Sequence, residues 1–457
     1  MAKLSETNQY LAAFTVNIIT LGVGASIGWS SQTLPILIKT SNESPLKVPL
    51  TKNEASWVEC NLAVGAIFGT FLFGYLSERI GRFWTAFMTA LPQIFWWICV
   101  IVGKSFTILL IGRFFAGLSA GGVFVLVPLY ISEISKDSLR GILGCFFMFA
   151  INLGTVLMFL AVEYLNYSIV PKIFISIPFI FTLTFMFLPE TPQYLLKRGE
   201  IKKAENSLRF LRGCQNFNEV PEKVKKELLV ISKEIEEETL VKNVSIIDKL
   251  RTLVARKSLI IGLVLVSVNQ LSGCLVFMNY KADIFINVGL KFSPEFFAII
   301  ISIIQVIGSV VSTFVVGSMT RKLLYISTCF GAISGFLAWG FCLNLFDKRT
   351  IFPWLSISAL SLAIFMASAG FLPLTFVLLS EILPQKIRSI GMTLCMALFW
   401  TLSFILHKIF INLVAFAQFY ISLLIFCGFI FLGMMFIVVY VPETRNKSGD
   451  EIEEALR

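Results

Sequence analysis

The chain has 457 residues, of which 56% are hydrophobic and 14% are charged, and its mean hydropathy is +0.83. A soluble domain of this size cannot keep so much apolar surface out of water, so the composition excludes a soluble protein. A helix needs roughly 20 mostly apolar residues to cross the about 30 Å of hydrocarbon in a bilayer. The lipid bilayer is therefore the first partner that the composition predicts.

Twelve apolar runs are long enough to span a membrane, in two sets of six on either side of a long charged segment. They begin near Leu11, Trp57, Trp84, Thr107, Gly141, Ser168, Ser258, Pro294, Leu323, Pro353, Ser389 and Phe416. We predict an all-α polytopic membrane protein with twelve transmembrane helices in two six-helix halves, an arrangement common in secondary carriers. The expected units are residues 1–189, a cytoplasmic helical linker at 190–257, residues 258–441 and a tail at 442–457.

The net charge of +10 is explained by topology. Placing both termini in the cytoplasm puts most Lys and Arg residues in cytoplasmic segments, as the positive-inside rule requires. This pattern accounts for the charge better than nucleic-acid binding does. We expect a multi-pass protein of the plasma membrane, a monomer, with both termini cytoplasmic.

The nine cysteines lie mostly within apolar runs and show neither the spacing of metal ligands nor a paired framework. They are interpreted as small core residues, with no disulfide, metal or cofactor expected. No nucleophile elbow or phosphate loop is present, and the chain has a single histidine. An enzyme is therefore the class that the sequence favours least.

The first span contains Gly22, Gly24 and Gly28, which permit the close helix packing and local unwinding that a rocking helix needs. A plain packing face is the alternative. It contains no Asp or Glu between Leu11 and Leu37. Proton-driven carriers usually bury a titratable group in their path, so this absence favours facilitated diffusion.

A short polar segment precedes this span, and an outer loop follows it. The short polar segment Met1–Tyr10 is not typical of a cleavable signal peptide, so we expect the first span to act as its own insertion signal. In the outer loop that follows, Asn42-Glu43-Ser44 is a candidate N-glycosylation site, although Pro45 weakens it.

One acid and one base recur at the ends of two apolar runs. Glu133 ends the run from Gly112 and is followed seven residues later by Arg140, and Glu381 is followed at the same distance by Arg388. Pro189-Glu190-Thr191 recurs likewise as Pro442-Glu443-Thr444. A duplicated pair of charges at two membrane exits indicates a gate, rather than a catalytic centre.

The turn after the second span, at 74–82, holds Glu78, Arg79 and Arg82 and can clamp neighbouring helix ends through charge-assisted hydrogen bonds. An ordinary positively charged cytoplasmic turn is the alternative. The corresponding turn of the second half, at 317–322, keeps two cations and has no acid. We therefore expect weaker charge-assisted contacts between helix ends in the second half.

These motifs resemble those of the sugar porter branch of the major facilitator superfamily, and most closely the insect facilitated trehalose transporter group. The resemblance covers essentially the whole chain and rests on the turn at 74–82, Gly112-Arg113, Pro128 to Ile134, Arg140-Gly141, 189–192, 269–273, 380–384 and 442–445. It implies a cytoplasmic salt-bridge network that forms when the carrier faces outward. By motif position the network comprises Glu78, Arg79, Arg82, Glu133, Arg140, Glu190, Glu381, Arg388 and Glu443, with Arg113 at the inner end of the fourth span.

A sugar site needs neutral amides and hydroxyls together with an aromatic face. Asn269 and Gln270 lie within an otherwise apolar span, Gln305 is the lone amide of the eighth span, and Trp400 is a candidate platform. Each amide can contact a ligand or bond to another helix. Tyr280, with Phe277, is either an outer lid or a packing residue, and His407 is a pH sensor or an interfacial residue without a function.

Several positions depart from the pattern that the resemblance implies. Asn269 replaces a glutamine, Leu275 an asparagine and Met148 a glutamine, while Asn152 lies one turn beyond Met148 and could restore an amide. The other departures are Ser368, Phe376, Phe399 and Ser403, which flank Trp400 or face the same presumed cavity. The binding residues implied are therefore Asn269, Gln270, Gln305, Trp400, Phe376, Asn152, Met148, Ser403 and Tyr280, in a cavity with fewer polar groups than is usual.

The sequence thus predicts a facilitative carrier of a neutral sugar, a hexose or a trehalose-like disaccharide, that works by alternating access. A proton-coupled sugar symporter and a non-transporting sugar sensor with the same fold remain as alternatives.

Overall fold

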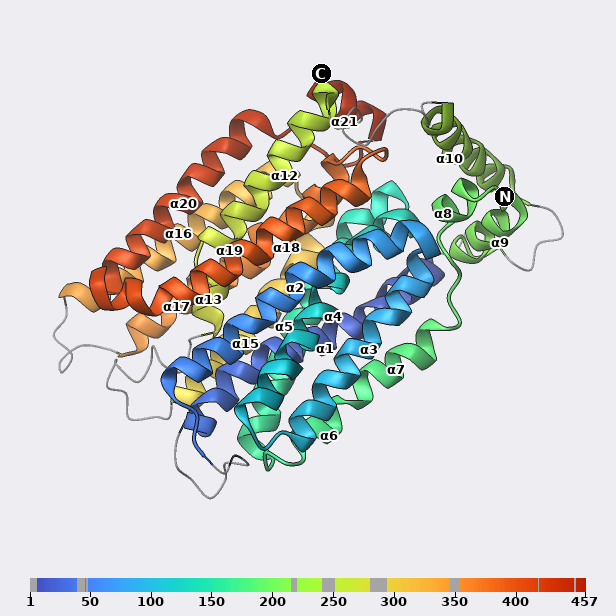
Figure 1. The fold of residues 1–457 in the computed structure, drawn as a ribbon. Helices are drawn as coiled ribbons and strands as arrows, with labels where there is room; N and C mark the ends of the chain where they lie inside the picture. The colour runs from blue at the N-terminus through green and yellow to red at the C-terminus, as the bar shows by residue number, and fades with distance from the viewer. Residues whose placement is uncertain are drawn as a thin grey trace.

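A computed structural model describes residues 6–38, 46, 48–214, 220–240, 251–279, 294–345, 353–417, 419–447 and 449–457. Within these ranges the regular structure is entirely helical, and long helices run side by side through one bundle (Figure 1). Tyr280 and Asn42, expected as a lid residue and a glycosylation site, lie outside the described residues.

The N-terminal helices of the bundle are α1 (Thr7–Ile38), α2 (Lys52–Ile80), α3 (Arg82–Val102), α4 (Phe106–Ile134), α5 (Asp137–Tyr164), α6 (Val170–Phe174) and α7 (Ser176–Phe185). The C-terminal helices are α12 (Leu253–Leu271), α13 (Cys274–Asn279), α15 (Pro294–Ser318), α16 (Arg321–Leu345), α17 (Pro353–Ala369), α18 (Phe371–Ile382), α19 (Arg388–Ala417) and α20 (Phe419–Tyr440). Eleven stretches of the described chain are long and apolar enough to cross a membrane, and the shorter apolar stretch Val170–Phe185 adds one more. The twelve spans predicted from the sequence are thereby accounted for.

Three spans are broken, and each break has a local cause. Pro178 cannot donate a hydrogen bond to the carbonyl of Phe174, and the sixth span is interrupted between α6 and α7. Between α12 and α13, Gly273 adopts a φ of +71°, which a glycine tolerates without strain. Gly370 separates α17 from α18. Irregular backbone inside a membrane is tolerated where it faces protein or a cavity, so the last two breaks point to the interior of the bundle.

Glycines allow the N-terminal helices to approach one another closely. A Cβ atom added at Gly121 of α4 would lie 2.0 Å from the carbonyl oxygen of Ala66 in α2, and one at Gly69 of α2 would lie 2.1 Å from that of Leu118. On α1, a Cβ at Gly24 would lie 2.1 Å from the carbonyl oxygen of Ile151 in α5. The first span is therefore closely packed at Gly24.

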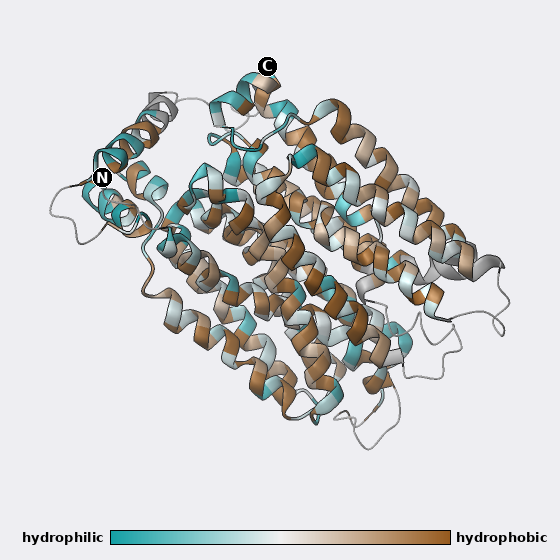
Figure 2. Ribbon diagram, turned by 180° about the vertical axis from the view of Figure 1, so that it is seen from behind, coloured by the Kyte–Doolittle hydropathy of each residue, from teal (hydrophilic) through white to brown (hydrophobic). Residues whose placement is uncertain are grey.

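Polar residues gather at one end of the bundle, beside three short linker helices, whereas apolar residues cover its length (Figure 2). These linker helices are α8 (Pro192–Lys197), α9 (Ile201–Leu211) and α10 (Glu222–Leu240), and the C-terminal helix α21 (Gly449–Leu456) lies at the same end (Figure 1). We call this end the linker face. The predicted helical character of the linker is confirmed for its described residues.

Arg212 holds the linker helices against the bundle. Its side chain is buried, donates to the carbonyl of Ile134 at the end of α4 at 3.0 Å and pairs with Glu227 of α10. The start of α1 adds a second contact, since Asn8 donates to the carbonyl of Phe210 at 2.6 Å. On the C-terminal helices, Lys257 donates to the carbonyl of Leu456 in α21 at 2.9 Å.

Replacing Gly121 with alanine tests the close packing of α2 and α4. The new methyl group has no room beside the carbonyl of Ala66, so we expect a loss of about 1–3 kcal/mol of stability, as overpacked cores show. Thermal unfolding of the detergent-purified protein measures this loss. Gly428→Ala is the matched control, because nothing lies within 4 Å of a Cβ at Gly428 and its melting temperature should not fall. Equal melting temperatures of the two variants would contradict the packing account.

Candidate functional site

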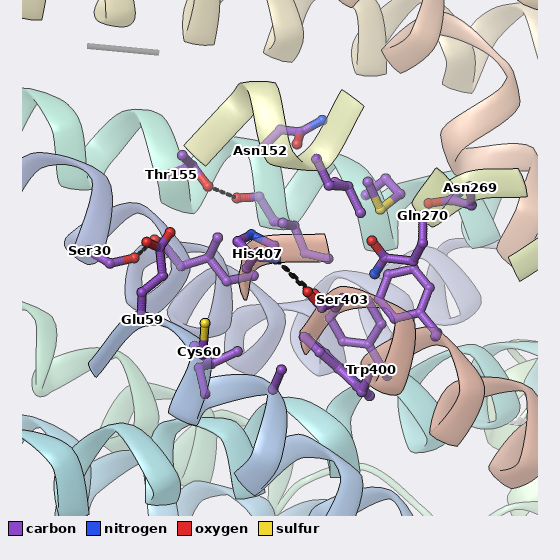
Figure 3. Close-up of a pocket in the computed structure, with 18 of the residues that line it drawn as sticks. Ser30, Glu59, Cys60, Asn152, Thr155, Asn269, Gln270, Trp400, Ser403 and His407 are labelled. Atoms are coloured by element: carbon purple, nitrogen blue, oxygen red, sulfur yellow. Dashed lines mark hydrogen bonds between the residues drawn. The ribbon is translucent and has the colours of Figure 1, made fainter. Parts of the chain in front are cut away.

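A central cavity lies between the N-terminal and C-terminal helices and has a volume of about 80 Å³ for the centre of a water-sized sphere. A single water needs only about 10–15 Å³ on that measure, so the cavity can hold a polar solute in place of several waters. Figure 3 shows the side chains that converge on it from α1, α2, α5, α12 and α19. The predicted residues that line it are Met148, Asn152, Asn269, Gln270, Gln305, Phe376, Trp400 and Ser403.

Unpaired polar atoms of α12 and α19 occupy one part of the cavity. Gln270 is 1% exposed, and neither its Oε1 nor its Nε2 has a hydrogen-bond partner among the described residues. Asn269 donates from Nδ2 to the carbonyl of Leu372 at 3.3 Å, which leaves its Oδ1 unpaired. Trp400 contributes an unpaired indole N–H. Two acceptors and two donors without a partner among the described residues therefore lie along one cavity, where leaving their hydrogen bonds unmade is costly.

The break after α12 explains how these amides reach the cavity. They lie in the last turn of α12, just before the chain turns at Ser272 and Gly273. The side chain of Ser272 accepts from the backbone N–H of Cys274 at 3.3 Å and donates to the carbonyl of Asn269 at 2.7 Å, which satisfies part of the interrupted backbone. The ring of Phe426 packs on Gly273, so a side chain at position 273 has no room.

The other two amides join the N-terminal helices to the C-terminal helices. Gln305 of α15 donates from Nε2 to Oδ1 of Asn152 in α5, and Asn152 donates from Nδ2 to the hydroxyl of Ser309 in α15. From the sequence, Gln305 could either contact a ligand or bond to another helix. In this structure it bonds to another helix. Asn152 is thus placed in the cavity as expected, but its amide is engaged across the two sets of helices.

An aromatic cluster centred on Phe124 of α4 closes the cavity on another side. Its ring centroid lies 5.6 Å from that of Phe376, 5.5 Å from that of Phe399 and 4.9 Å from that of Trp400. Phe147 of α5 joins the cluster at 5.1 Å from Phe376. Phe376 and Phe399, two of the departures from the expected pattern, therefore pack with Phe124 and Trp400 in one apolar wall that both sets of helices share.

Three ionisable side chains line a further part of the cavity. They are Glu59 of α2, Arg113 of α4 and His407 of α19 (Figure 3 labels Glu59 and His407). The Nδ1 atom of His407 lies 2.7 Å from the carbonyl oxygen of Ser403, so Nδ1 carries a proton that it donates. His407 is 7% exposed, so its side chain is buried in the wall of the cavity. Glu59 was not predicted, although a lone carboxylate inside the second apolar run is a signal for it.

Arg113 does not belong to the charge network at the linker face, and its predicted place at the inner end of the fourth span is wrong. It lies 20 positions before Glu133 on α4, which is about 30 Å along a helix. Its guanidinium is 1% exposed and donates to the carbonyl of Ser26 at 2.6 Å and to the hydroxyl of Ser30 at 2.9 Å. Arg113 therefore belongs to the wall of the central cavity.

At the linker face, Arg82 links three helix ends. Its guanidinium lies 3.0 Å from Glu133 of α4 and 2.8 Å from Glu78 of α2. The carboxylate of Glu190 accepts the backbone N–H groups of Arg82 and Phe83 at 3.1 Å each, at the start of α3. Four of the predicted residues are thus brought together, and Glu190 occupies the N-terminal end of a helix, where a negative charge is favourable.

Arg321, which was not in the predicted set, is the centre of a second charge cluster. It lies 3.1 Å from Glu381, and the hydroxyl of Thr444 donates to Glu381 at 2.6 Å. Glu443 accepts the backbone N–H of Arg321 at 2.9 Å and that of Lys322 at 3.2 Å. The turn at 317–322 lacks an acid, but Glu381 and Glu443 supply the negative charge from elsewhere.

The remaining predicted network residues have other partners. Arg140 pairs with Asp137 within α5 at 2.8 Å, so the expected pairing of Glu133 with Arg140 does not form. Arg388 donates to the carbonyl of Leu383 at 3.2 Å and lines the same crevice as Glu78 and Glu133. Arg79 lies over the ring of Tyr75 at 5.3 Å. The acids instead receive Arg82 and Arg321, which enter from the first turns of α3 and α16.

A family comparison identifies the chain. The model of the sugar (and other) transporter family matches residues 13–456. The chain belongs to this family. The resemblance inferred from the motifs is confirmed, and family membership places the protein among multi-pass membrane transporters, not among enzymes.

The relatives of this transporter agree with the family. The facilitated trehalose transporter Tret1 of Bombyx mori is 32% identical over 460 residues, which cover 99% of the present chain and 88% of that protein. The protein of the same name from Apis mellifera ligustica is 30% identical over 451 residues, with coverage of 98% and 88%. Both alignments extend over all the motifs described above.

Solved structures show the same fold. The proton:xylose symporter XylE bound to 6-bromo-6-deoxy-D-glucose superposes on the transporter with a TM-score of 0.82, at 21% identity and 99% coverage of both chains. The inward open conformation of XylE from E. coli gives a TM-score of 0.69, at 20% identity and 98% coverage of both chains. The predicted major facilitator fold is confirmed.

Replacing Arg321 with glutamine tests the second charge cluster. Glu381 would keep a side chain that is 5% exposed but lose its ionic partner, and uncompensated buried charges cost roughly 3–5 kcal/mol. We expect the linker face to open more often, so a cysteine introduced at Ile142, which packs on Gly317, should react faster with a maleimide. The exposed pair of Lys203 and Glu200 provides the control, because Lys203→Gln should leave that rate unchanged. Unchanged reactivity in Arg321→Gln would show that this ion pair does not hold the face closed.

The environment of Glu190 predicts a pH dependence. Burial raises the pKa of Glu190 from 4.5 to about 7, against the opposing effect of its backbone hydrogen bonds. The folded protein therefore retains a proton that the unfolded chain loses, and this stabilisation is complete below pH 4.5 and disappears as the pH rises through 7. Melting temperatures measured from pH 5 to pH 8 should fall in the native protein, and Glu190→Gln should remove that part of the slope. Glu200→Gln, at a half-buried position, should retain the full slope. A native slope in Glu190→Gln would contradict the assignment.

Proposed function

We propose that this transporter carries a neutral sugar, a hexose or a trehalose-like disaccharide, by facilitated diffusion. The observation that carries the proposal is the buried amide of Gln270 in the central cavity, whose donor and acceptor atoms both lack partners in the described part of the chain. Asn269 and Trp400 add one acceptor and one donor nearby. A sugar hydroxyl both donates and accepts, so one solute can satisfy all four atoms without bringing a charge into the membrane.

The shape of the cavity wall supports the same class of solute. The aromatic cluster of Phe124, Phe376, Phe399 and Trp400 offers an apolar face for the C–H surface of a sugar ring. The trehalose transporters of Bombyx mori and Apis mellifera ligustica are relatives over nearly the whole chain, which favours a disaccharide among the neutral sugars.

Transport then proceeds by alternating access between residues 1–189 and 258–441, with the linker and both termini in the cytoplasm of a monomer in the plasma membrane. In the present arrangement Asn152 and Gln305 bond to one another across the two sets of helices. The hydroxyls of a bound sugar can replace the hydrogen bond between Asn152 and Gln305. That bond would then no longer hold the two sets of helices together. A solute drives such a change only as far as it binds one arrangement better than the other.

Replacing Gln270 with leucine tests the proposal. Uptake of labelled trehalose and glucose is measured in oocytes, and the loss of two hydrogen bonds should lower kcat/KM of the transported sugar by roughly ten- to a hundredfold. Gln93→Leu is the matched control: Gln93 is also 1% exposed with both amide atoms unpaired, but it does not line the cavity. If the native protein takes up neither sugar in a saturable way, the transport proposal is contradicted. Binding of a sugar without flux would support a non-transporting sensor.

Proton-coupled sugar transport is a second candidate, and Glu59 is the observation that favours it. The carboxylate lines the cavity together with Arg113 and His407, and ionisable groups inside a membrane often mark proton paths. XylE, which shares the fold, is described as a proton:xylose symporter.

Uptake with and without a pH gradient separates the two candidates. Facilitated diffusion predicts that the internal sugar concentration never exceeds the external one at pH 5.5 or 7.5 and that sugar causes no alkalinisation of the medium. Accumulation above equilibrium that disappears in Glu59→Gln would replace the uniport proposal with symport.

A further inference from the structure

A groove on the outside of the bundle lies between α1 and α5, away from the central cavity. It is lined by Phe14, Asn17, Leu21, Phe146, Phe149 and Leu153, together with neighbouring apolar residues, and its volume is about 140 Å³ for the centre of a water-sized sphere. Apolar side chains that face lipid need no special explanation. Asn17 does, because it is an amide in the wall of a groove that is otherwise apolar.

Helix packing sets the two ends of the groove. At one end, α1 and α5 touch, since a Cβ atom at Gly154 would lie 2.0 Å from the carbonyl oxygen of Leu21. At the other end, the rings of Tyr10 and Phe146 meet with centroids 6.4 Å apart. Between these contacts the groove is lined by Asn17 and Ile18 of α1 and by Phe149 and Ala150 of α5, and the small side chain of Ala150 leaves space there.

The amide of Asn17 is only half satisfied. Its Nδ2 donates to the carbonyl of Ala13 at 2.8 Å, but its Oδ1 has no donor among the described residues, and the residue is 5% exposed. Hydrocarbon cannot supply the missing donor. The terminal torsion of an asparagine is broad, so the oxygen can turn toward a donor that enters the groove.

The depth of Asn17 restricts which lipid can supply that donor. Helix α1 has 32 residues and is therefore about 48 Å long, so about 9 Å extends beyond each side of a hydrocarbon layer of about 30 Å if the helix is centred. Asn17 lies ten residues, or about 15 Å, from the start of α1, which places it about 6 Å inside the layer on the side of the linker face. Phospholipid acyl chains carry no hydrogen-bond donor, whereas a sterol carries one hydroxyl at the polar end of its ring system.

We propose that this groove is a sterol-binding site in which the sterol hydroxyl donates a hydrogen bond to Oδ1 of Asn17. The rigid ring system lies along the groove against Phe146 and Phe149, with its tail directed toward Leu21 and Leu153. The proposal is independent of the transported solute, because none of these residues lines the central cavity.

Photolabelling of the full-length protein tests the site. The protein is placed in phosphatidylcholine nanodiscs with a photoreactive sterol probe, and free cholesterol competes with the probe. Cholesterol 3-O-methyl ether lacks the hydroxyl donor, so it should compete about three- to tenfold less well. Asn17→Leu preserves the volume but removes the acceptor, and it should lower labelling by a similar factor and abolish the difference between the two competitors.

A second variant tests the groove itself. Ala150→Phe fills the floor and should eliminate labelling, whereas Leu157→Phe, on the exposed side of α5 outside the groove, should label as the native protein does. Labelling that survives in Ala150→Phe shows that the sterol binds elsewhere and overturns the proposal. Equal competition by the two sterols also overturns it, because the groove then accepts any apolar chain. If Ala150→Phe does not fold, the competition experiment and Asn17→Leu decide alone.

Discussion

The interior of a membrane supplies no water, so each polar group there must find its partner in the protein or in a ligand. This constraint accounts for the helical architecture, because a helix satisfies its own backbone, and for the location of the breaks at Gly273 and Gly370, which lie within the bundle. It also divides the polar side chains into distinct groups. Those at the linker face form ion pairs, Asn152 and Gln305 bond to one another, and Gln270 has no partner among the residues that the structure describes.

The two paired groups of polar side chains stabilise different contacts between the helices. Ion pairs centred on Arg82 and Arg321 stabilise one arrangement of the helix ends, and breaking either would leave a buried charge. The bond between Asn152 and Gln305 and the aromatic cluster around Phe124 join the two sets of helices near the cavity. A solute that satisfies Gln270 and displaces the bond between the two amides would weaken one of these connections and leave the others intact. Binding would thus be coupled to a change in the balance between two arrangements, without any charge crossing the membrane.

Much of the fold could be predicted from the sequence because hydropathy alone identifies the spans, and the motifs are local. Gln270 was also predictable, since an amide in an apolar run must meet a partner or a ligand. The role of Gln305 could not be predicted in this way, because its partner Asn152 is 153 positions away. For the same reason, the pairing of Glu133 with Arg82 instead of Arg140 depends on which helix ends meet, which spacing along the chain does not reveal.

Two other differences had signals in the sequence. A span that ends at Glu133 must carry Arg113 near its opposite end, away from the linker face. The structure places this guanidinium in the wall of the cavity. Glu59 is a carboxylate within an apolar run. It places a titratable group in the cavity, although the first transmembrane span has no Asp or Glu between Leu11 and Leu37.

The account rests on one claim, that a neutral sugar is the missing partner of the Gln270 amide. A cryo-EM structure of the protein with trehalose bound measures this directly. The account predicts a sugar between Gln270 and Trp400, with hydroxyl oxygens at about 3 Å from the amide of Gln270 and the bond between Asn152 and Gln305 lengthened or broken. A sugar bound elsewhere, with the Gln270 amide still unpaired, would contradict it.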